Sequence, residues 1–344
     1  MACVFEAEAS EIPGLITRQY RGLDRKLAAV VARLDTLSPS LFATIARGSS
    51  NHAAAFVAYL VGMGLRLPAA ALPPSLASVY RTTLRLDRAC VLAISQSGES
   101  PDVNVALAHA RTGGAFTLGL INDMDSALGR IVDVVLGVGA GTEVATAATK
   151  SFMLSATAGL HLAGKWGRDA TLLAALQHFP DVVASAQPGE WGDALDLFAG
   201  ADDAFVVGRG PALAIAQELA LKLAEVCGIH AQALSAAELL HGPIAIASPN
   251  RPAIVFAGDD RTQHSIDESV SRLLAAGSPV LVLSAQYRAA AAAAKMVPVP
   301  NAGHPVLQPL AALYATYPFI ADLARVRGRD PDRPPHLMKI TRTF

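Results

Sequence analysis

The chain has 344 residues, of which 52% are hydrophobic and 17% charged, and this is enough to bury the cores of two ordinary domains. Its net charge is −1 with no basic block or tail, so there is no electrostatic case for a nucleic-acid partner or an anionic membrane. The three cysteines are widely spaced, so we expect neither disulfides nor a metal site. There is no apolar run approaching ~20 residues and no basic leader, so we expect a cytoplasmic protein without a membrane span.

Residues 1–36 carry apolar residues at helical spacing, so they are predicted to form an N-terminal helical segment. Strands and helices then alternate, which indicates a parallel sheet with helices on both faces. The predicted strands cover residues 41–46, 91–94, 115–121 and 132–138, and the predicted helices cover residues 51–65, 102–111 and 145–166. These elements define a first domain, residues 37–168.

A helical linker is predicted over residues 169–200, after which the order of elements restarts in a second domain, residues 201–328. Its predicted strands cover residues 204–207, 251–257, 279–284 and 296–298, and its predicted helices cover residues 212–227, 265–276 and 307–327. The segment IARGSSNHAAAFVAYL aligns with VVGRGPALAIAQELAL, which indicates duplication of one unit. We therefore predict an α/β fold of two tandem, doubly wound parallel sheets, each a flavodoxin-like three-layer sandwich.

The segment SQSGES, residues 95–100, joins a buried strand to a helix that opens with Pro101. Its hydroxyls, its glycine and the positive end of the following helix suit a phosphate group. A serine-rich surface turn that only caps the helix is the alternative. The second repeat has Asp259 and Asp260 at the corresponding place, so one phosphate site per chain is predicted. The sequence offers no reason for the carboxylate of Glu99 beside a phosphate.

Three polar loops of the first domain are predicted to leave the carboxyl ends of its strands: residues 47–51, 95–100 and 141–150. Ligands of doubly wound sheets bind at this edge, so the three loops together predict a polar pocket. Residues 208–210 read Gly-Arg-Gly but lack the third glycine and the acidic residue of a dinucleotide fingerprint. We therefore expect no cofactor.

One face of the predicted helix 212–227 carries Glu218, Lys222 and Glu225 among apolar residues. A solvated salt bridge is the usual meaning of such spacing, but the apolar surroundings predict partial burial and a candidate proton-transfer base. Downstream, His241 precedes a Gly-Pro turn and suits acid–base opening of a sugar ring. Glu238 and His241 are only half of a metal site, and no second pair is present.

The last segment, residues 329–344, is too proline-rich for a helix. It contains Lys339 between Met338 and Ile340. A surface lysine on an extended segment is one interpretation. The other is an amine docked in an active site, where it can form a Schiff base with a ketose.

Five motifs spanning nearly the whole chain resemble a known family: ARGSSNHAA, ISQSGESPD, AATKSF, GRGPALAIAQELALKLAEVCGIHAQALSAAELLHGP and DPDRPPHLMK. The chain resembles the double sugar-isomerase-domain (SIS) proteins, namely the isomerase half of glutamine–fructose-6-phosphate aminotransferase and, more closely, the stand-alone glucosamine-6-phosphate deaminases. The resemblance implies two SIS domains and an active site shared within a homodimer.

The resemblance also implies roles for individual residues. The residues that would bind the substrate and its phosphate lie in two loops: Ser49, Ser50, Ser95, Gln96, Ser97 and Ser100. Glu225 would move a proton between C1 and C2 with support from Lys222, and His241 would open the ring, often from the partner subunit. Lys339, next to Met338, would meet the ketose carbonyl. Thr146 and Ala148 stand where the synthase contacts sugar hydroxyls, although Ala148 replaces a serine there.

The start of the chain departs from the glutamine-dependent synthase, which begins with a nucleophilic cysteine and a glutaminase domain. Here Cys3 is not terminal and the first predicted strand already begins at residue 41. We therefore expect conversion of glucosamine 6-phosphate to fructose 6-phosphate and ammonia, without glutamine hydrolysis. The alternatives are a deaminase, deglycase or isomerase for another phosphosugar, such as galactosamine 6-phosphate, and a non-catalytic phosphosugar-binding regulator.

Overall fold

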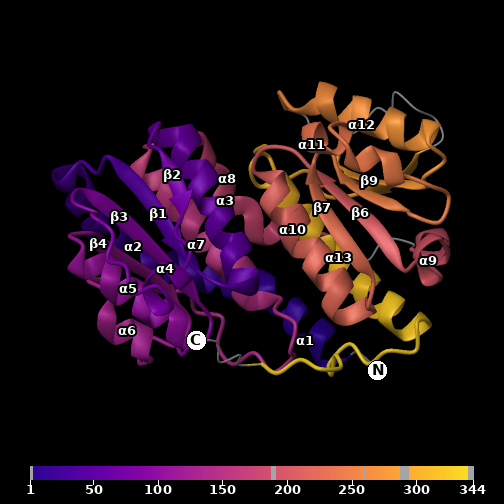
Figure 1. The fold of residues 1–344 in the computed structure, drawn as a ribbon. Helices are drawn as coiled ribbons and strands as arrows, with labels where there is room; N and C mark the ends of the chain where they lie inside the picture. The colour runs from indigo at the N-terminus through magenta and orange to yellow at the C-terminus, as the bar shows by residue number, and fades with distance from the viewer. Residues whose placement is uncertain (1–2, 187–190, 259, 287–293, 340–344) are drawn as a thin grey trace. The chain divides into compact units, whose positions relative to one another are not determined.

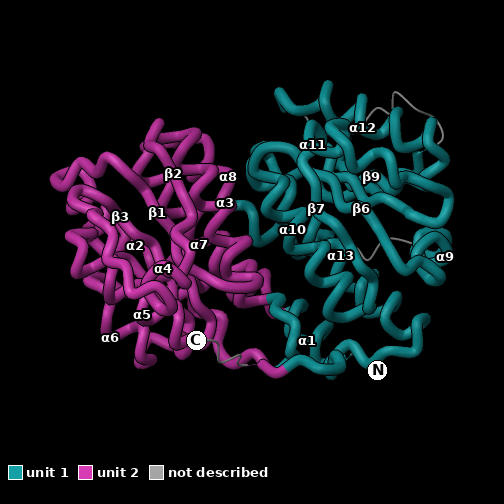
Figure 2. Tube along the Cα trace, viewed as in Figure 1, with its two compact units in different colours: residues 1–10, 144–149, 178–337 teal, residues 11–143, 150–177, 338–344 magenta. Residues whose placement is uncertain are grey.

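The computed structural model describes residues 3–186, 191–258, 260–286 and 294–339. The described chain divides into two compact units, coloured in Figure 2. Unit 1 comprises residues 1–10, 144–149 and 178–337, and unit 2 comprises residues 11–143, 150–177 and 338–344. Each unit contains one five-stranded sheet (Figure 1).

The sheet of unit 2 is parallel throughout and has the strand order β2-β1-β3-β4-β5. Its strands are β1 (Leu41–Ile45), β2 (Ala69–Ala71), β3 (Ala89–Ser95), β4 (Phe116–Ile121) and β5 (Val134–Gly137). Every residue of β3 is buried, because helices cover both faces of the sheet. This burial explains why the strand is a continuous apolar run rather than an alternating one.

One face of this sheet is covered by α2 (Ile12–Leu37), α3 (Gly48–Leu65) and α7 (Lys150–Trp166). The other face is covered by α4 (Ser75–Ser78), α5 (Pro101–Thr112) and α6 (Ala127–Ile131), whose apolar side chains join one core with β1 and β3. α7 packs against both α2 and α3, and all but one of its residues are buried. α8 (Ala170–Ala184) begins in unit 2 and ends in unit 1.

The sheet of unit 1 is also parallel, with the order β10-β9-β8-β6-β7. Its strands are β6 (Asp203–Gly208), β7 (His230–Ser235), β8 (Ala253–Phe256), β9 (Val280–Ser284) and β10 (Lys295–Pro298). Read from its other end, this is the strand order of unit 2, as duplication of one unit requires. The predicted fold of two tandem parallel-sheet sandwiches is confirmed.

The helices of unit 1 complete its three layers. α10 (Ala212–Lys222) and α13 (Gln308–Val326) pack on one face of the sheet, and α11 (Ala236–Leu240) and α12 (Gln263–Ala275) share a core with the other face. α1 (Val4–Ser10) packs against α13, as does α9 (Gly192–Ala199). Two short helical turns complete the unit: the π-helical η1 (Leu223–Cys227) and the 3₁₀-helical η2 (Pro243–Ile246).

The predicted elements need several corrections. The elements that were not predicted are β2, α4, α6, β7 and α11. α7 begins at Lys150 rather than at residue 145, and the predicted helix 212–227 is divided into α10 and η1. In the non-helical segment before α7, the buried carboxylate of Glu8 accepts hydrogen bonds from the backbone N–H groups of Val144 and Ala145. Because these two N–H groups bind Glu8, the backbone at residues 144 and 145 is a loop, although sequence spacing assigned residue 145 to the helix.

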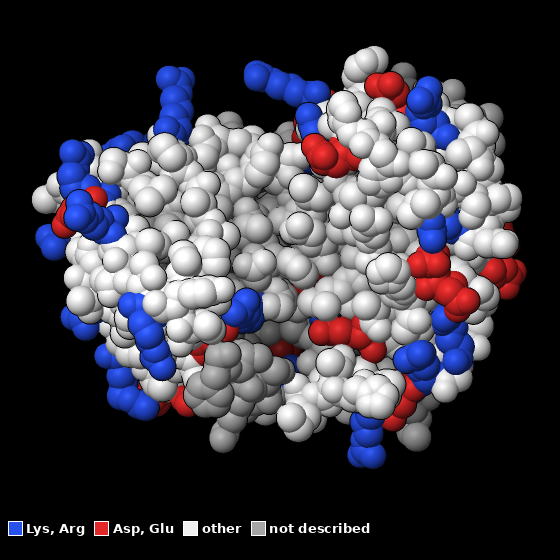
Figure 3. Space-filling model, in the orientation of Figure 1, with Lys and Arg blue, Asp and Glu red and all other residues white. Residues whose placement is uncertain are grey.

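Two surface properties bear on possible partners. Among the described residues, no helix has both the length and the apolar character that a membrane span requires. On the face drawn in Figure 3, much of the surface is uncharged; basic side chains predominate among the charged groups of unit 2, and basic and acidic side chains are mixed over unit 1.

Candidate active site

Two polar loops leave neighbouring strands of unit 2 at the same edge of the sheet. Ile45 of β1 lies opposite Ala93 of β3, and each strand leads directly to a helix, α3 or α5. These helices have 18 and 12 residues. Each has the positive end of its dipole at its N-terminus, and the two N-termini lie at this edge of the sheet, where they favour an anion. We call residues 47–51 and 95–100 the anion loops. The first two polar loops thus lie at the same edge of the sheet, as the sequence analysis predicted.

The hydroxyl oxygens of the second anion loop partly hold the loop itself together. Ser95 Oγ accepts a hydrogen bond from Gly98 N at 2.9 Å, and Ser97 Oγ accepts one from Glu99 N at 3.3 Å. The side chain of Ser100, the N-cap residue of α5, makes no capping bond. Because a serine hydroxyl is one donor and two acceptors, these bonds use only acceptor capacity of Ser95 and Ser97.

Gly98 and Glu99 are both explained by the neighbouring start of α6. Gly98 has a φ of +65°, and a Cβ at this position would lie 1.9 Å from Ser126 Oγ, so only glycine fits. Glu99 Oε1 accepts a hydrogen bond from Ala127 N at 2.9 Å, where a carboxylate is favourable at a helix N-terminus. The carboxylate of Glu99 therefore binds the N-terminus of α6, which explains a negative charge in this loop.

An ion pair that the sequence analysis did not predict links the first anion loop to α5. Arg47 Nε and Nη2 lie 2.7 Å and 2.6 Å from Asp102 Oδ2, in the first turn of α5. The carboxylate is 2% exposed and the guanidinium side chain 52% exposed. The pair ties the N-cap of α3 to α5 and fixes the spacing of the two helix ends. The sequence does contain one indication of this pair: Arg47 follows a strand and stands directly before Gly-Ser-Ser.

The third predicted loop divides between the units, with Glu143 in unit 2 and residues 144–149 in unit 1. Thr146 and Ala148 are half-buried in the latter segment. Glu143 is also a residue that sequence reasoning missed. Its side chain is fully buried and accepts hydrogen bonds from Ser151 N at 3.1 Å and Ser151 Oγ at 2.6 Å, at the start of α7.

Lys339 lies beside that carboxylate, with its Nζ 2.9 Å from Glu143 Oε2. Its side chain is 25% exposed, whereas Met338 is 75% exposed. The lysine that the sequence assigned to the tail is thus a partly buried group paired with a buried acid. Ile340 and Asp259 lie outside the described residues. Asp260 binds its own turn, because its Oδ1 accepts hydrogen bonds from the backbone and hydroxyl of Thr262.

In unit 1, Glu218, Lys222 and Glu225 form a cluster that we call the ion trio. Lys222 Nζ lies 3.4 Å from Glu218 Oε1 and 2.5 Å from Glu225 Oε2. Lys222 and Glu218 are fully buried, whereas Glu225 is 22% exposed. Burial alone lowers the pKa of Lys222, but the two carboxylates outweigh it and the pKa is raised. The predicted burial of this charged face is correct.

The chain changes from α-helix to π-helix inside the ion trio. α10 ends at Lys222, and the π-helical turn η1 carries Glu225. Side chains at i and i+3 already face each other on an α-helix, and single π-turns of this kind are frequent at functional sites. Gly228, with a φ of +65°, ends the turn. The result is one carboxylate fixed in the interior and one at the surface, both bound to the same cation.

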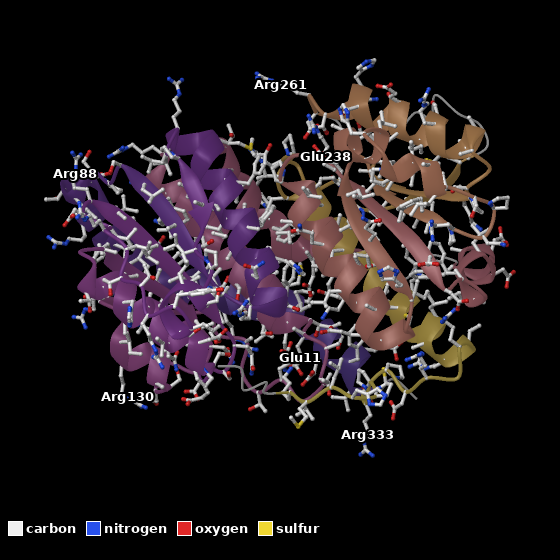
Figure 4. The ribbon with its side chains drawn as sticks, viewed as in Figure 1. Glu11, Arg88, Arg130, Glu238, Arg261 and Arg333 are labelled. Atoms are coloured by element: carbon white, nitrogen blue, oxygen red, sulfur yellow. The ribbon has the colours of Figure 1, made fainter. Side chains whose placement is uncertain are left out.

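His241 follows α11, immediately before Gly242, whose φ is +141°. The histidine is exposed, and its backbone N–H donates to Glu238 O. Glu238 is also exposed on α11, as the label in Figure 4 shows. No group of three or more metal-binding side chains occurs among the described residues. The imidazole of His241 is therefore accessible to solvent.

Comparisons with known proteins agree with this architecture. Two segments, residues 42–163 and 197–318, match the family model described as the SIS domain. A protein of Silicibacter pomeroyi, provisionally described as a phosphosugar isomerase, has 36% sequence identity and a TM-score of 0.90. The match covers 96% of this chain and 100% of that one.

The glutamine–fructose-6-phosphate aminotransferase of Symbiobacterium thermophilum is 32% identical over 342 residues, covering 95% of this chain and 54% of that protein. The chain thus spans about half the length of the curated relatives it matches. The glucosamine-6-phosphate deaminase of Thermotoga maritima has a TM-score of 0.77 at 19% identity, and it covers 99% of this chain and 100% of its own. At that identity the likeness concerns the fold alone.

Proposed function

This chain belongs to the SIS domain family, and from that premise we propose that it is a phosphosugar isomerase that deaminates glucosamine 6-phosphate to fructose 6-phosphate and ammonia. The observation that carries the proposal is the ion trio. A buried cation and two carboxylates are costly to keep out of water, and a partly exposed carboxylate held by a buried ammonium is suited to proton transfer. A protein that only binds a sugar phosphate has no need for such a group.

In the proposed reaction the anion loops bind the phosphate and His241 opens the sugar ring. The carboxylate of Glu225 takes the proton from C2 of the open-chain aldehyde, which gives an enolamine. The same proton is then returned at C1, so that C2 becomes an imine. Water adds to the imine, ammonia leaves, and fructose 6-phosphate remains.

Lys222 is proposed to hold the side chain of Glu225 in position for the two proton transfers. Lys339 is proposed to meet the ketose carbonyl, which requires its amine to exchange Glu143 for the substrate. Thr146 and the backbone of Ala148 are proposed to contact sugar hydroxyls, and Met338 to lie against the substrate. We further propose a homodimer in which His241 serves the partner's site.

None of the three cysteines is proposed as a nucleophile in this reaction. A cysteine nucleophile reacts as its thiolate. Burial raises the pKa of Cys3 to about 11, and it raises the pKa of both Cys90 and Cys227 to about 12. All three side chains therefore remain thiols near neutral pH.

The test is to mix purified protein with glucosamine 6-phosphate and to measure ammonia and fructose 6-phosphate. The expected result is equimolar formation of both products. The Glu225→Gln variant should still bind phosphosugar but lose at least about 10²-fold in turnover, the usual contribution of a general base. If the wild-type protein forms neither product, the proposed reaction is wrong.

A panel with galactosamine 6-phosphate and a fructose-linked amine 6-phosphate distinguishes the remaining enzymes. Ammonia from the first substrate indicates the epimeric deaminase, and amine release from the second indicates a deglycase. A plain isomerase would interconvert aldose and ketose phosphates without nitrogen release. A phosphosugar-binding regulator would bind the panel with no turnover, and Glu225→Gln would leave its behaviour unchanged.

A further inference from the structure

The two anion loops supply a single full positive charge. Residues 47–51 read RGSSN and residues 95–100 read SQSGES, so Arg47 is their one basic residue. Hydroxyls and helix ends offer only partial positive charges, whereas a phosphate monoester carries a charge of about −1.5 to −2 near neutral pH. An ionised donor makes a hydrogen bond roughly twice as strong as a neutral one. The position of Arg47 therefore matters for any phosphate at this edge.

The backbone of Arg47 lies beside the first residue of the second anion loop. Ile45 of β1 pairs with Ala93 of β3, and Arg47 keeps an extended backbone, with a φ of −135° and a ψ of 157°. Neighbouring strands of a sheet lie about 4.8 Å apart. Continued by two residues, the parallel register places Arg47 level with Ser95, where the second loop begins.

The guanidinium of Arg47 lies at the other end of the same loop. The loop ends at Ser100, the N-cap of α5, and Asp102 follows in the first turn of that helix. Arg47 Nε and Nη2 donate to Asp102 Oδ2 at 2.7 Å and 2.6 Å, which uses two of the five N–H groups of a guanidinium. The arginine thus spans the second loop from its first residue to the turn after its last. A phosphate bound in this loop would therefore lie beside the guanidinium.

Asp102 holds the guanidinium in this position. Its carboxylate is 2% exposed, and its second oxygen, Oδ1, accepts a hydrogen bond from Val103 N at 2.9 Å. Both carboxylate oxygens are therefore bonded, which fixes the carboxylate and the guanidinium on it. A carboxylate in the first turn of a helix takes up the positive end of the helix dipole, so Asp102 alone would oppose a phosphate there. The charge of Arg47 offsets this opposition.

Unit 1 provides an internal comparison. β6, β8 and α12 occupy in unit 1 the places that β1, β3 and α5 occupy in unit 2. Arg209 follows β6, but its Nη1 donates to Ser235 Oγ, at the end of β7, at 2.9 Å. The first turn of α12, residues 263–266, contains no acidic residue. The pair of an arginine and an acid in the helix turn thus occurs in the copy that has the serine-rich loops.

We propose that Arg47 is a further phosphate-binding residue of the anion loops and that Asp102 is its positioning residue. The N–H groups that Asp102 does not engage donate to the phosphate oxygens. The inference rests on the proposed function, because it takes the anion loops to be the phosphate site. It adds a requirement for charge: the site selects a dianionic phosphate ester over a monoanionic ester of the same sugar, such as a sulfate.

The experiment titrates the full-length protein with fructose 6-phosphate and with fructose 6-sulfate in a calorimeter, at about pH 7.5, where the phosphate is a dianion. Arg47→Gln should weaken phosphate-ester binding by about tenfold to a hundredfold, the effect of a lost hydrogen bond to a charged group. Its effect on the sulfate ester should be smaller, because that ester has one charge fewer. Arg47→Lys keeps the charge and should recover part of the affinity. Asp102→Asn removes the opposing carboxylate and should bind the phosphate ester severalfold more tightly.

The matched control is Arg111→Gln. Arg111 lies in the last turn of α5, its side chain is 54% exposed, and its Nε lies 3.0 Å from Asp133 Oδ1. It therefore resembles Arg47 in exposure and in its acidic partner, but it is at the opposite end of the helix, and its loss should leave both affinities unchanged. Thermal melts of all variants verify that they fold.

Two results would show that Arg47 is only a structural brace and would overturn the proposal. One is an Arg47→Gln variant that binds fructose 6-phosphate as tightly as the wild type. The other is a loss that disappears when Arg47→Gln is made in the Asp102→Asn protein. If the wild type binds no fructose 6-phosphate, the phosphate site is wrong and the inference fails with it. Binding without ammonia release from glucosamine 6-phosphate would refute the proposed reaction alone and leave the role of Arg47 to be decided by the variants.

Discussion

At the scale of single residues, Lys222 is the group on which the folded state of unit 1 depends most directly. It is fully buried and neutralises Glu218, which is also fully buried. Removing one partner of such a cluster leaves an uncompensated charge in the interior, whereas a cation at the surface is replaced by water. The same substitution at two lysines should therefore have very different effects.

We predict that Lys222→Met lowers the free energy of unfolding by about 3–5 kcal/mol. Lys165→Met is the control. The side chain of Lys165 is 24% exposed and pairs at 2.6 Å with Asp24, which is 64% exposed. Its loss leaves a carboxylate that water can hydrate, so it should cost at most about 1 kcal/mol. Urea denaturation of both variants measures the two values. Equal, small losses would mean that the ion trio is hydrated in solution.

His161 is the second residue with a measurable thermodynamic role. It lies on α7 with its ring in edge contact with Tyr20, at a centroid distance of 5.3 Å. Burial and then the charge of Lys165 lower the pKa of His161 to about 4, against the opposing effect of Asp24. The unfolded chain therefore binds this proton near pH 6.5 and the folded chain only near pH 4.

The sign of the pH dependence follows from this difference. The contribution of neutral, buried His161 to the free energy of unfolding is complete above pH 6.5. It is lost as the pH falls toward 4, by up to about 3 kcal/mol. We predict that His161→Phe loses less stability than the wild type between about pH 7.5 and pH 5, as measured by urea denaturation at each pH. Parallel pH profiles for the two proteins would show that His161 is hydrated.

At the scale of elements, the second anion loop depends on the start of α6. Gly98→Ala should place a methyl group against Ser126 and also impose a left-handed backbone on alanine. The backbone alone costs about 1–2 kcal/mol, and the overpacking costs about 1–3 kcal/mol more. We predict lower stability and a raised KM for phosphosugar, measured by thermal unfolding and steady-state kinetics.

Gly139→Ala separates the two contributions, because Gly139 has a φ of +74° but no atom within 4 Å of the place that a Cβ would take. It should show the backbone cost only. Adding Ser126→Gly to Gly98→Ala should recover part of the stability and of the KM. Identical losses for Gly98→Ala and Gly139→Ala would contradict the tight packing of loop and helix.

The elements also show which parts of the fold a sequence can predict. Strands such as β3 were predictable because burial on both faces produces an unbroken apolar run. β7 was not, since its residues His230–Ser235 are mixed in polarity and only partly buried. β2 is three exposed alanines. It is a strand only because it pairs with β1, and local propensity does not encode that pairing.

The candidate site divides in the same way. The anion loops and Lys222 were predictable from residue type and spacing, because hydroxyls before a helix and charges on an apolar face are local signals. The partners Asp102 and Glu143 were not, since they lie 55 and 196 residues from Arg47 and Lys339. The pairing of Glu225 with Lys222 was predictable from helical spacing, but the π-helical turn η1 that carries Glu225 was not.

At the scale of the whole molecule, the proposed homodimer with a shared site can be tested by complementation. Glu225→Gln and His241→Ala should each be inactive alone. If each site takes Glu225 from one subunit and His241 from the other, a mixed dimer has one intact site. Random mixing should then restore about a quarter of the wild-type activity. No recovery after unfolding and refolding the mixture would mean that each chain uses its own histidine.

The pairing of Lys339 with Glu143 has a consequence for biosynthesis. Glu143 is buried in unit 2, but the ammonium that faces it lies 196 residues further along the chain. On a translating ribosome, residues 11–143 and 150–177 emerge long before residue 339, so this ion pair of unit 2 can form only after the whole of unit 1 has been made. Chains that stop before this lysine lack that contact, and their unit 2 should therefore be less stable than in the full chain.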